Sequence, residues 1–290
     1  MPTLGDTATN IARRLERARL HFGHGTDNAR DEAAWLVLHA AGLPVHSAPL
    51  NTGRKLSVAA LTRIEELTRE RIRTRKPLAY LIHEAWFAGL PFYVDERALI
   101  PRSLIGEWIP SRFRPWLDPA RVRRILEIGT GSGCIAVALA HAFPRAKVIA
   151  TDVSENALAV ARINVERHRL GESVELRHGS LYGPVAGKRF DLIVSNPPYV
   201  SAARMRKLPE EYRHEPVNAL LALNKGLELI EPMLLNAAEH LTPHGILVIE
   251  TGAARKPLER RYPGLPLHWL ASASGEECVL LVARAELSRL

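Results

Sequence analysis

Phe190-Asp191-Leu192-Ile193-Val194-Ser195-Asn196-Pro197-Pro198-Tyr199 joins a strand pattern to an abrupt stop. The first five residues are largely apolar and β-branched, which is typical of a buried strand. Neither proline can donate to a sheet ladder, so the strand must end at Asn196. A residue before a proline also favours extended backbone angles. The stretch therefore predicts an amide and an aromatic ring at the carboxyl edge of a sheet, where open α/β sheets bind ligands.

An amide, a proline-fixed carbonyl and an aromatic ring together form a pocket that suits a planar group carrying an NH2. The alternative interpretation is a plain turn that ends a strand. The residues upstream decide between them, since they predict a ligand-binding sheet of which this strand is one member.

From Arg121 onward, strand and helix patterns alternate, which predicts an α/β fold with a mostly parallel, doubly wound sheet and helices on both faces. The last two strands are joined by a short link, so we expect them to form an antiparallel edge. The expected strands are residues 125–128, 147–151, 174–177, 191–194, 246–250, 268–271 and 278–283, and the expected helices are residues 134–143, 154–170, 226–241 and 255–262.

A glycine-rich loop, Glu127-Ile128-Gly129-Thr130-Gly131-Ser132-Gly133, follows the first of these strands. Its spacing is Gly-x-Gly-x-Gly, one residue shorter than the dinucleotide fingerprint, and it has no Gly-Lys-Ser/Thr to hold a triphosphate. Asp152 ends the next strand, where an acid accepts hydrogen bonds from a ribose. Together these features predict a site for a nucleoside without a pyrophosphate.

Residues 1–80 are expected to form a separate helical domain, with helices over residues 11–22 and 31–41 and a third between the N-cap Ser57 and about residue 75. They carry 13 Lys and Arg against 8 Asp and Glu. This excess of positive charge favours a substrate-recognition domain, and a stabilising cap is the alternative. Residues 81–103 are expected to be a connector with an aromatic β-hairpin near Gly89. A helix is expected from about residue 100 to 110, and residues 104–290 are expected to be the catalytic domain.

Composition excludes several classes of protein. The chain of 290 residues has no apolar run near the roughly 20 residues that span a bilayer, so we expect no membrane. Two cysteines, Cys134 and Cys278, cannot form a disulfide framework, which favours a cytoplasmic protein, and the 12 histidines have no metal-type spacing. The net charge of +8 favours an acidic partner such as RNA, or else a solvated basic surface.

The glycine loop, the acid after the second strand and Asn-Pro-Pro-Tyr, in this order, resemble the class I S-adenosylmethionine-dependent methyltransferases, which have a Rossmann-like sheet. Asn-Pro-Pro-Tyr is similar to the motif of members that methylate planar NH2 groups in DNA, RNA or glutamine side chains. A small helical N-terminal domain joined by a hairpin resembles the HemK-like protein-(glutamine-N5) methyltransferases. The resemblance implies S-adenosyl-L-methionine as the cofactor.

Two further stretches resemble one branch of this family, which acts on the large-subunit ribosomal protein L three. They are residues 77–103, including Ile100-Pro101-Arg102-Ser103, and Glu211-Tyr212-Arg213-His214-Glu215-Pro216. The sister branch, which acts on peptide chain release factors, usually has Pro-Arg-Pro in place of residues 101–103. The resemblance thus implies that a glutamine of protein L three is methylated. The substrate is then either the free protein or the protein within an assembling particle, with ribosomal RNA nearby. Release factors, or the exocyclic amines of DNA or RNA, are the alternatives, although we expect no DNA partner.

The resemblance also implies a set of site residues. The Asn196 side-chain oxygen and the Pro197 carbonyl would accept the hydrogens of the substrate NH2, and Tyr199 would pack on its amide plane. The family commonly has an acid at the position of Ser180, which puts a side-chain contact to the adenine amine in question. The implied catalytic residues are Asn196, Pro197, Pro198 and Tyr199, and the implied cofactor-binding residues are Glu127, Gly129, Thr130, Gly131, Gly133, Asp152, Ser180, Leu181 and Asn196. No metal ligand is expected. Residues 201–216 and the N-terminal helices are expected to form the substrate-recognising rim, with His214 ordering that segment.

Overall fold

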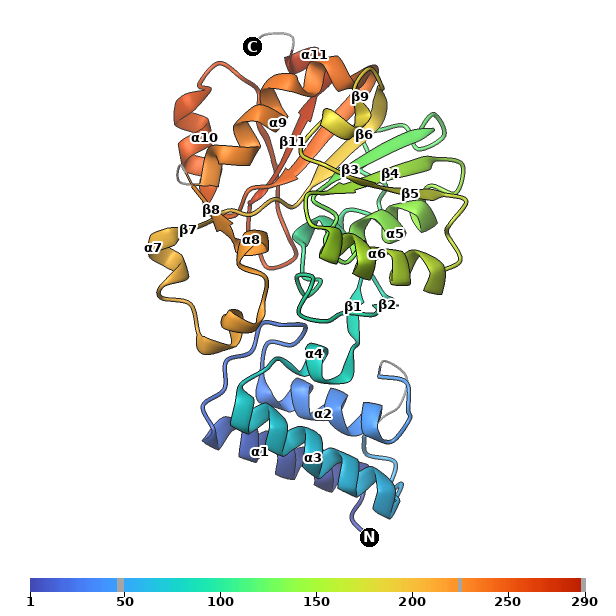
Figure 1. The fold of residues 1–290 in the computed structure, drawn as a ribbon, viewed down its shortest axis with the longest axis vertical. Helices are drawn as coiled ribbons and strands as arrows, with labels where there is room; N and C mark the ends of the chain where they lie inside the picture. Colours follow the sequence, from blue (N-terminus) through green and yellow to red (C-terminus); the bar gives the residue numbers. More distant parts are fainter. Residues whose placement is uncertain (46–49, 224–225, 288–290) are drawn as a thin grey trace. The chain divides into compact units, whose positions relative to one another are not determined.

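The computed structural model describes residues 1–45, 50–223 and 226–287 (Figure 1). The chain forms two compact units. The first comprises Met1–Ala85, Val94–Glu96 and Pro209–His214, and the second comprises Trp86–Tyr93, Arg97–Leu208 and Glu215–Leu290. Residues 209–214 therefore belong to the first unit although they follow the Asn-Pro-Pro-Tyr motif. The functional division at residues 80 and 103 stays a prediction.

The first unit contains α1 (Leu4–Arg17), α2 (Ala29–Ala40), α3 (Val58–Thr74) and α4 (Leu78–Ile82). Ser57 caps α3 as predicted, because its side chain accepts a hydrogen bond from the Ala60 amide. The predicted range of the first helix, residues 11–22, is wrong at both ends. The helix begins seven residues earlier, at Leu4, where Thr3 caps it by accepting a hydrogen bond from the Asp6 amide, and the chain leaves the helix before Arg19, whose φ is 50°.

A buried ion cluster holds residues 209–214 within the first unit. The Glu211 carboxylate is buried and accepts hydrogen bonds from the His21 amide at 2.8 Å and from Arg75 Nη2 at 2.6 Å. The Arg71 guanidinium is also buried, lies 3.8 Å from Glu211 and donates to Glu32 at 2.8 Å. His214 Nε2 lies 3.0 Å from the Thr74 carbonyl oxygen. His214 thus orders this segment, as the sequence predicts.

The second unit is built on a seven-stranded sheet with the order β10-β11-β9-β6-β3-β4-β5. The central strands β3, β4, β5, β6 and β9 pair in parallel, which confirms the predicted doubly wound sheet. The last two strands do pair antiparallel, but β11 lies inside the sheet, between β9 and β10, and runs against both. The strands are β3 (Arg124–Ile128), β4 (Lys147–Asp152), β5 (Val174–His178), β6 (Phe190–Ser195), β9 (Leu241–Glu250), β10 (His268–Leu270) and β11 (Val279–Ala283).

Helices cover both faces of this sheet (Figure 1). Side chains alternate along each strand, so neighbouring residues such as Ile125 and Leu126 enter different cores. One core contains Ile125, Val148 and Leu192 together with α5 (Cys134–Ala142). The other contains Leu126, Ile149 and Ile193 together with α9 (Leu227–His240). The remaining helices are α6 (Glu155–Arg167), α7 (Ala202–Met205), α8 (Val217–Leu220), α10 (Arg255–Arg261) and α11 (Arg284–Leu287).

Short elements connect the layers. The predicted hairpin is present as β1 (Ala85–Phe87) and β2 (Leu90–Phe92). The helix predicted from residue 100 to 110 is only a 3-10 turn, η1 (Leu104–Glu107), which is followed by further turns. A short parallel pair, β7 (Val200–Ser201) and β8 (Leu221–Ala222), follows the Asn-Pro-Pro-Tyr motif. The other 3-10 turns are η2 (Gly183–Val185), η3 (Glu210–His214) and η5 (Gly252–Ala254). Over the described ranges, no helix combines the length and apolar character that a bilayer crossing requires.

Candidate active site

Four loops meet at the carboxyl edge of the sheet because of the register of β3, β4, β5 and β6. Ile128 pairs with Ser195 on one side and with Thr151 on the other, and Asp152 pairs with His178. Parallel strands that end in register place the segments following them side by side. The glycine loop therefore adjoins both Asp152 and Asn196, and the loop from Gly179 to Leu181 adjoins Asp152. The structure thus brings together the residues that the sequence analysis selected.

The glycine loop offers an open cradle. The amides of Gly129 and Thr130 donate to the Thr151 carbonyl at 2.8 and 2.9 Å, which anchors the loop to β4. Gly129 and Gly131 have φ of +74° and +56°, and a Cβ at either position would meet no atom within 4 Å. Such backbone angles favour glycine. The free space beside these two residues, next to the N-terminus of α5, fits a ligand that approaches the backbone closely.

Two acids border this cradle. Glu127 is only 1% exposed, its carboxylate accepts a hydrogen bond from the Thr130 hydroxyl at 2.6 Å, and burial raises its pKa to about 8. The two Asp152 carboxylate oxygens accept from the amides of Gly131 and Ser154, at 2.8 and 2.9 Å. Burial raises the pKa of Asp152, while these amides oppose the shift. A carboxylate oxygen can accept more than one hydrogen bond, so Asp152 can bind a diol as well as fix the loop.

The Asn-Pro-Pro-Tyr segment leaves β6 beside the cradle. Ser195 is buried, and its hydroxyl donates to the Ile128 carbonyl at 2.7 Å, which ties the ends of β6 and β3 together. The Asn196 amide is half-buried and makes no side-chain hydrogen bond to the parts of the chain that the structure describes. Tyr199 is half-buried, and its hydroxyl donates to Glu250 Oε1 at 2.9 Å. The amide is therefore open to a ligand, whereas the ring is held from behind.

The loop after β5 is the fourth part of the site. The Gly179 amide donates to the Asp152 carbonyl at 2.9 Å, which brings Ser180 and Leu181 to the same edge. Ser180 is exposed and Leu181 is half-buried. Sequence analysis missed Val153, which directly follows Asp152 and is 61% exposed. The sequence does contain a valine directly after a strand-end acid, and the structure adds that this apolar side chain is exposed, which suits the flat face of a base.

The cysteines and the metal-ligating side chains add nothing to this site. Burial raises the pKa of Cys134 to about 12 and that of Cys278 to about 11, so neither thiol is ionised near neutral pH. No group of three or more His, Cys, Asp and Glu that could hold a metal ion occurs within residues 1–45, 50–223 and 226–287.

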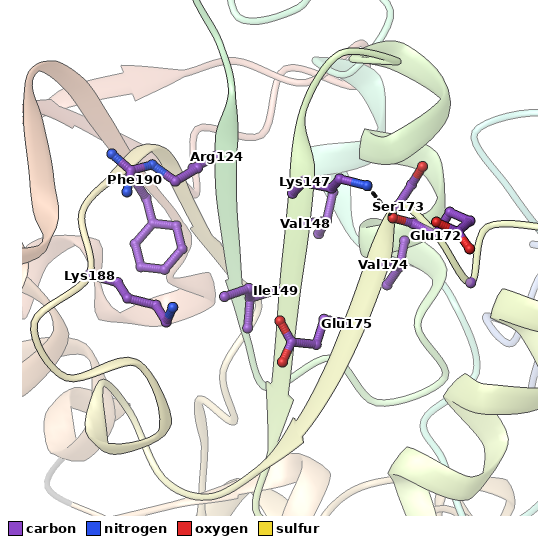
Figure 2. A pocket seen from close by; sticks show the side chains of 11 residues that line it. Arg124, Lys147, Val148, Ile149, Glu172, Ser173, Val174, Glu175, Lys188 and Phe190 are labelled. Atoms are coloured by element: carbon purple, nitrogen blue, oxygen red, sulfur yellow. Dashed lines mark hydrogen bonds between the residues drawn. The ribbon is translucent and has the colours of Figure 1, made fainter.

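A pocket of about 330 Å³ lies at the opposite edge of the sheet, around the amino ends of β3, β4, β5 and β6 (Figure 2). Its lining has mixed charge, and Lys147 donates to the Glu172 carbonyl at 2.5 Å. This edge does not contain any of the four loops described above, so the pocket is separate from the candidate active site. Its lining residues are Arg124, Lys147, Val148, Ile149, Gly171, Glu172, Ser173, Val174, Glu175, Lys188 and Phe190.

Two family models match the chain. The "Methyltransferase small domain" matches residues 113–211, which include the glycine loop and the Asn-Pro-Pro-Tyr segment. The "PrmC N-terminal domain" matches residues 11–82.

Several curated relatives match nearly the whole chain under the name "Ribosomal protein uL3 glutamine methyltransferase". The protein from Neisseria meningitidis serogroup A is 44% identical over 99% of this chain and 95% of its own. The protein from Burkholderia pseudomallei is 41% identical over 98% and 95%, and that from Bordetella pertussis is 41% identical over 99% and 97%. Among solved structures, the hMettl16 catalytic domain in complex with an MAT2A 3'UTR hairpin covers 81% of this chain and 84% of that chain, with 18% identity and a TM-score of 0.50. That likeness supports the fold alone.

Proposed function

This chain belongs to the family of ribosomal protein uL3 glutamine methyltransferases, and we propose that it transfers a methyl group from S-adenosylmethionine to the side-chain amide nitrogen of a glutamine in uL3, the ribosomal protein L three. The observation that carries this proposal is the match of 41–44% identity over nearly the full length of both chains. The four loops at the carboxyl edge of the sheet support it, because they offer a nucleoside cradle beside the Asn196 amide, which is free of side-chain hydrogen bonds to the described residues.

The cofactor is S-adenosylmethionine, which when bound supplies an electrophilic methyl group on a sulfonium. We propose that Gly129, Thr130, Gly131 and Gly133 line its methionine and ribose parts, and that Asp152 holds the ribose. Glu127 is a buried acid that would give up its proton and become negatively charged when a cationic ligand binds beside it. Ser180, Leu181 and Val153 would edge the base.

The chain's own contribution to the reaction is orientation of the glutamine amide. An amide nitrogen is a poor nucleophile because its lone pair is delocalised into the carbonyl group. The Asn196 side-chain oxygen and the Pro197 carbonyl accept the two NH2 hydrogens, Pro198 stiffens the turn, and Tyr199 packs on the amide plane. Fixed geometry of this kind lowers a reaction barrier by several kcal/mol. The amide proton becomes acidic only after methylation, so these residues need not include a strong base.

The partner surface is a further part of the proposal. Residues 1–80 have an excess of positive charge, and exposed arginines such as Arg69 and Arg73 suit ribosomal RNA beside the modified loop of uL3. We propose that this domain recognises the substrate, that the substrate is uL3 in an assembling particle, and that the protein acts in the cytoplasm, where ribosomes are assembled.

The test is methyl transfer from tritiated S-adenosylmethionine by the purified chain to uL3, a release factor, RNA and DNA in separate reactions. We expect label in uL3 only, located on a glutamine by peptide mass spectrometry. Asn196→Ala serves as the inactive control. Label in the release factor or in DNA, with none in uL3, would overturn the proposal.

A further inference from the structure

The Tyr199 hydroxyl is fixed by a buried acid that no sequence motif selects. Its partner, Glu250, ends β9 and is only 4% exposed. Glu250 Oε1 accepts from Tyr199 at 2.9 Å. Oε2 accepts from the Ser103 hydroxyl at 2.6 Å and from the Leu104 amide at 2.9 Å. One oxygen thus bonds to the Asn-Pro-Pro-Tyr segment, and the other bonds to the start of η1, through its N-cap Ser103 and its first residue Leu104.

The Tyr199 ring is also held across one face. Gly252 has a φ of +50°, and a Cβ there would lie 2.5, 2.6 and 2.9 Å from three atoms of the Tyr199 ring. No real side chain tolerates such distances, so the ring lies directly against the backbone. The turn itself is fixed, because the amide and hydroxyl of Thr251 donate to the Cys278 carbonyl at 2.8 and 3.0 Å. The ring therefore has little freedom to tilt.

We propose that Glu250 is the positioning residue for Tyr199, and that Glu250 and Gly252 together set the plane against which the substrate amide packs. This inference rests on the proposed function, in which Tyr199 contacts that amide. Glu250 touches no reacting atom and acts through the phenol alone. Burial favours a fixed arrangement, since a buried carboxylate left without its hydrogen-bond donors would be costly.

A simpler interpretation is that Glu250 only anchors Ser103 and Leu104 through Oε2. The two interpretations differ in whether the hydrogen bond between Oε1 and Tyr199 matters for turnover, so an isosteric change at the phenol distinguishes them. Tyr199→Phe removes that bond and leaves the ring, Ser103 and Leu104 in place. Tyr262→Phe is a matched control, because the Tyr262 hydroxyl donates to Glu231 at 3.2 Å, on α9.

The experiment measures kcat and KM for uL3 methylation, the cofactor Kd by calorimetry, and the Tm of each variant. We expect Tyr199→Phe and Glu250→Ala each to lower kcat by ~10- to 100-fold, the change that corresponds to one lost hydrogen bond to a charged group. The cofactor Kd should stay within about threefold. The double variant should be no slower than the slower single variant, because both changes remove the same hydrogen bond between Tyr199 and Glu250. Tyr262→Phe should keep the wild-type kcat.

Glu250→Gln tests rescue. Its carbonyl oxygen can keep the Ser103 and Leu104 donors while its NH2 donates to the phenol oxygen, so we expect kcat to recover to within a few-fold of wild type. The inference is overturned if Tyr199→Phe turns over uL3 at the wild-type rate, or if Glu250→Ala lowers Tm alone. Both outcomes require a wild-type enzyme that methylates uL3, so they are distinct from failure of the proposed function, in which the wild-type enzyme itself leaves uL3 unlabelled.

Discussion

Glu127→Gln should remove a pH dependence of stability that the buried carboxyl group causes. Burial raises the pKa of Glu127 from 4.5 to about 8 in the folded chain, against the opposing effect of the Thr130 hydroxyl. Between these two values the folded state holds a proton that the unfolded state has lost. Stability therefore falls as pH rises through this window and is level above it.

The magnitude follows from the slope of this linkage, ~1.4 kcal/mol per pH unit. Between pH 5 and pH 7 the wild type should lose ~2–3 kcal/mol that Glu127→Gln retains, since glutamine cannot ionise and can still accept from Thr130. Thr130→Val should extend the window to higher pH, because it removes a hydrogen bond that favours the charged carboxylate.

The assay is urea unfolding of the wild type and the variant at pH 5, 6, 7 and 8. The difference between their free energies of unfolding cancels the titration of all other groups. A difference that stays constant from pH 5 to pH 8 would show that Glu127 is already ionised in the folded chain, and the reasoning would be wrong. If Glu127 faces the cationic cofactor, binding at pH 7 should also release about 0.9 proton from the wild type and none from Glu127→Gln. Calorimetry in buffers of different ionisation enthalpy measures that release.

Three other changes test the site and its support. Asp152→Ala should weaken S-adenosylmethionine binding by ~10- to 100-fold, measured by calorimetry, because it removes a charge-assisted hydrogen-bond acceptor; unchanged affinity would place the ribose elsewhere. Asn196→Ala should abolish most turnover and keep cofactor affinity within a few-fold, the pattern of an interaction made mainly in the transition state; near-normal kcat at saturation would rule out the amide clamp. Arg71→Met should lower the free energy of unfolding by ~3–5 kcal/mol, because it leaves the buried Glu32 carboxylate without its cation and removes one of the two cations beside Glu211. Arg69→Met, at an exposed ion pair, should cost less than ~1 kcal/mol, and equal effects in urea unfolding would contradict this account.

The sequence predicted the sheet and the loops of the candidate site because their signals are local. Apolar periodicity located the strands of the sheet, and glycines or prolines marked the points where the chain turns after them. The pairing of Ile128 with both Ser195 and Thr151 then follows from a parallel sheet with these strands as neighbours. The roles of the individual site residues stay predictions until the experiments above are done.

The local sequence pattern predicted the wrong bounds where contacts with distant parts of the chain outweigh the intrinsic preference of the residues for a helix or a strand. β9 begins at Leu241, five residues before its predicted start, although Pro243 and Gly245 both disfavour a strand. The pairing of Leu241 with Phe190, across a register shift, extends the strand through these residues. The helix predicted over residues 100–110 is likewise only the short turn η1, in which Gly106 packs against the Phe87 ring; a Cβ there would lie 2.8 Å from two ring atoms. Contacts between distant residues form at both places, and no window of sequence contains them.

Buried acids are the least predictable part, because a glutamate in a polar stretch is normally expected to face solvent. Glu250 and Glu215 are buried in the second unit, and Glu211 is buried in the first. Glu215 receives two hydrogen bonds from Arg102, at 2.5 and 2.7 Å, and one from the Ile100 amide. All three acids hold the stretch of chain that starts at Tyr199, with Glu250 at its beginning and Glu211 and Glu215 near its end. Their donors lie 51 to 190 residues away in sequence, so only the folded chain reveals that buried acids hold this stretch at both ends.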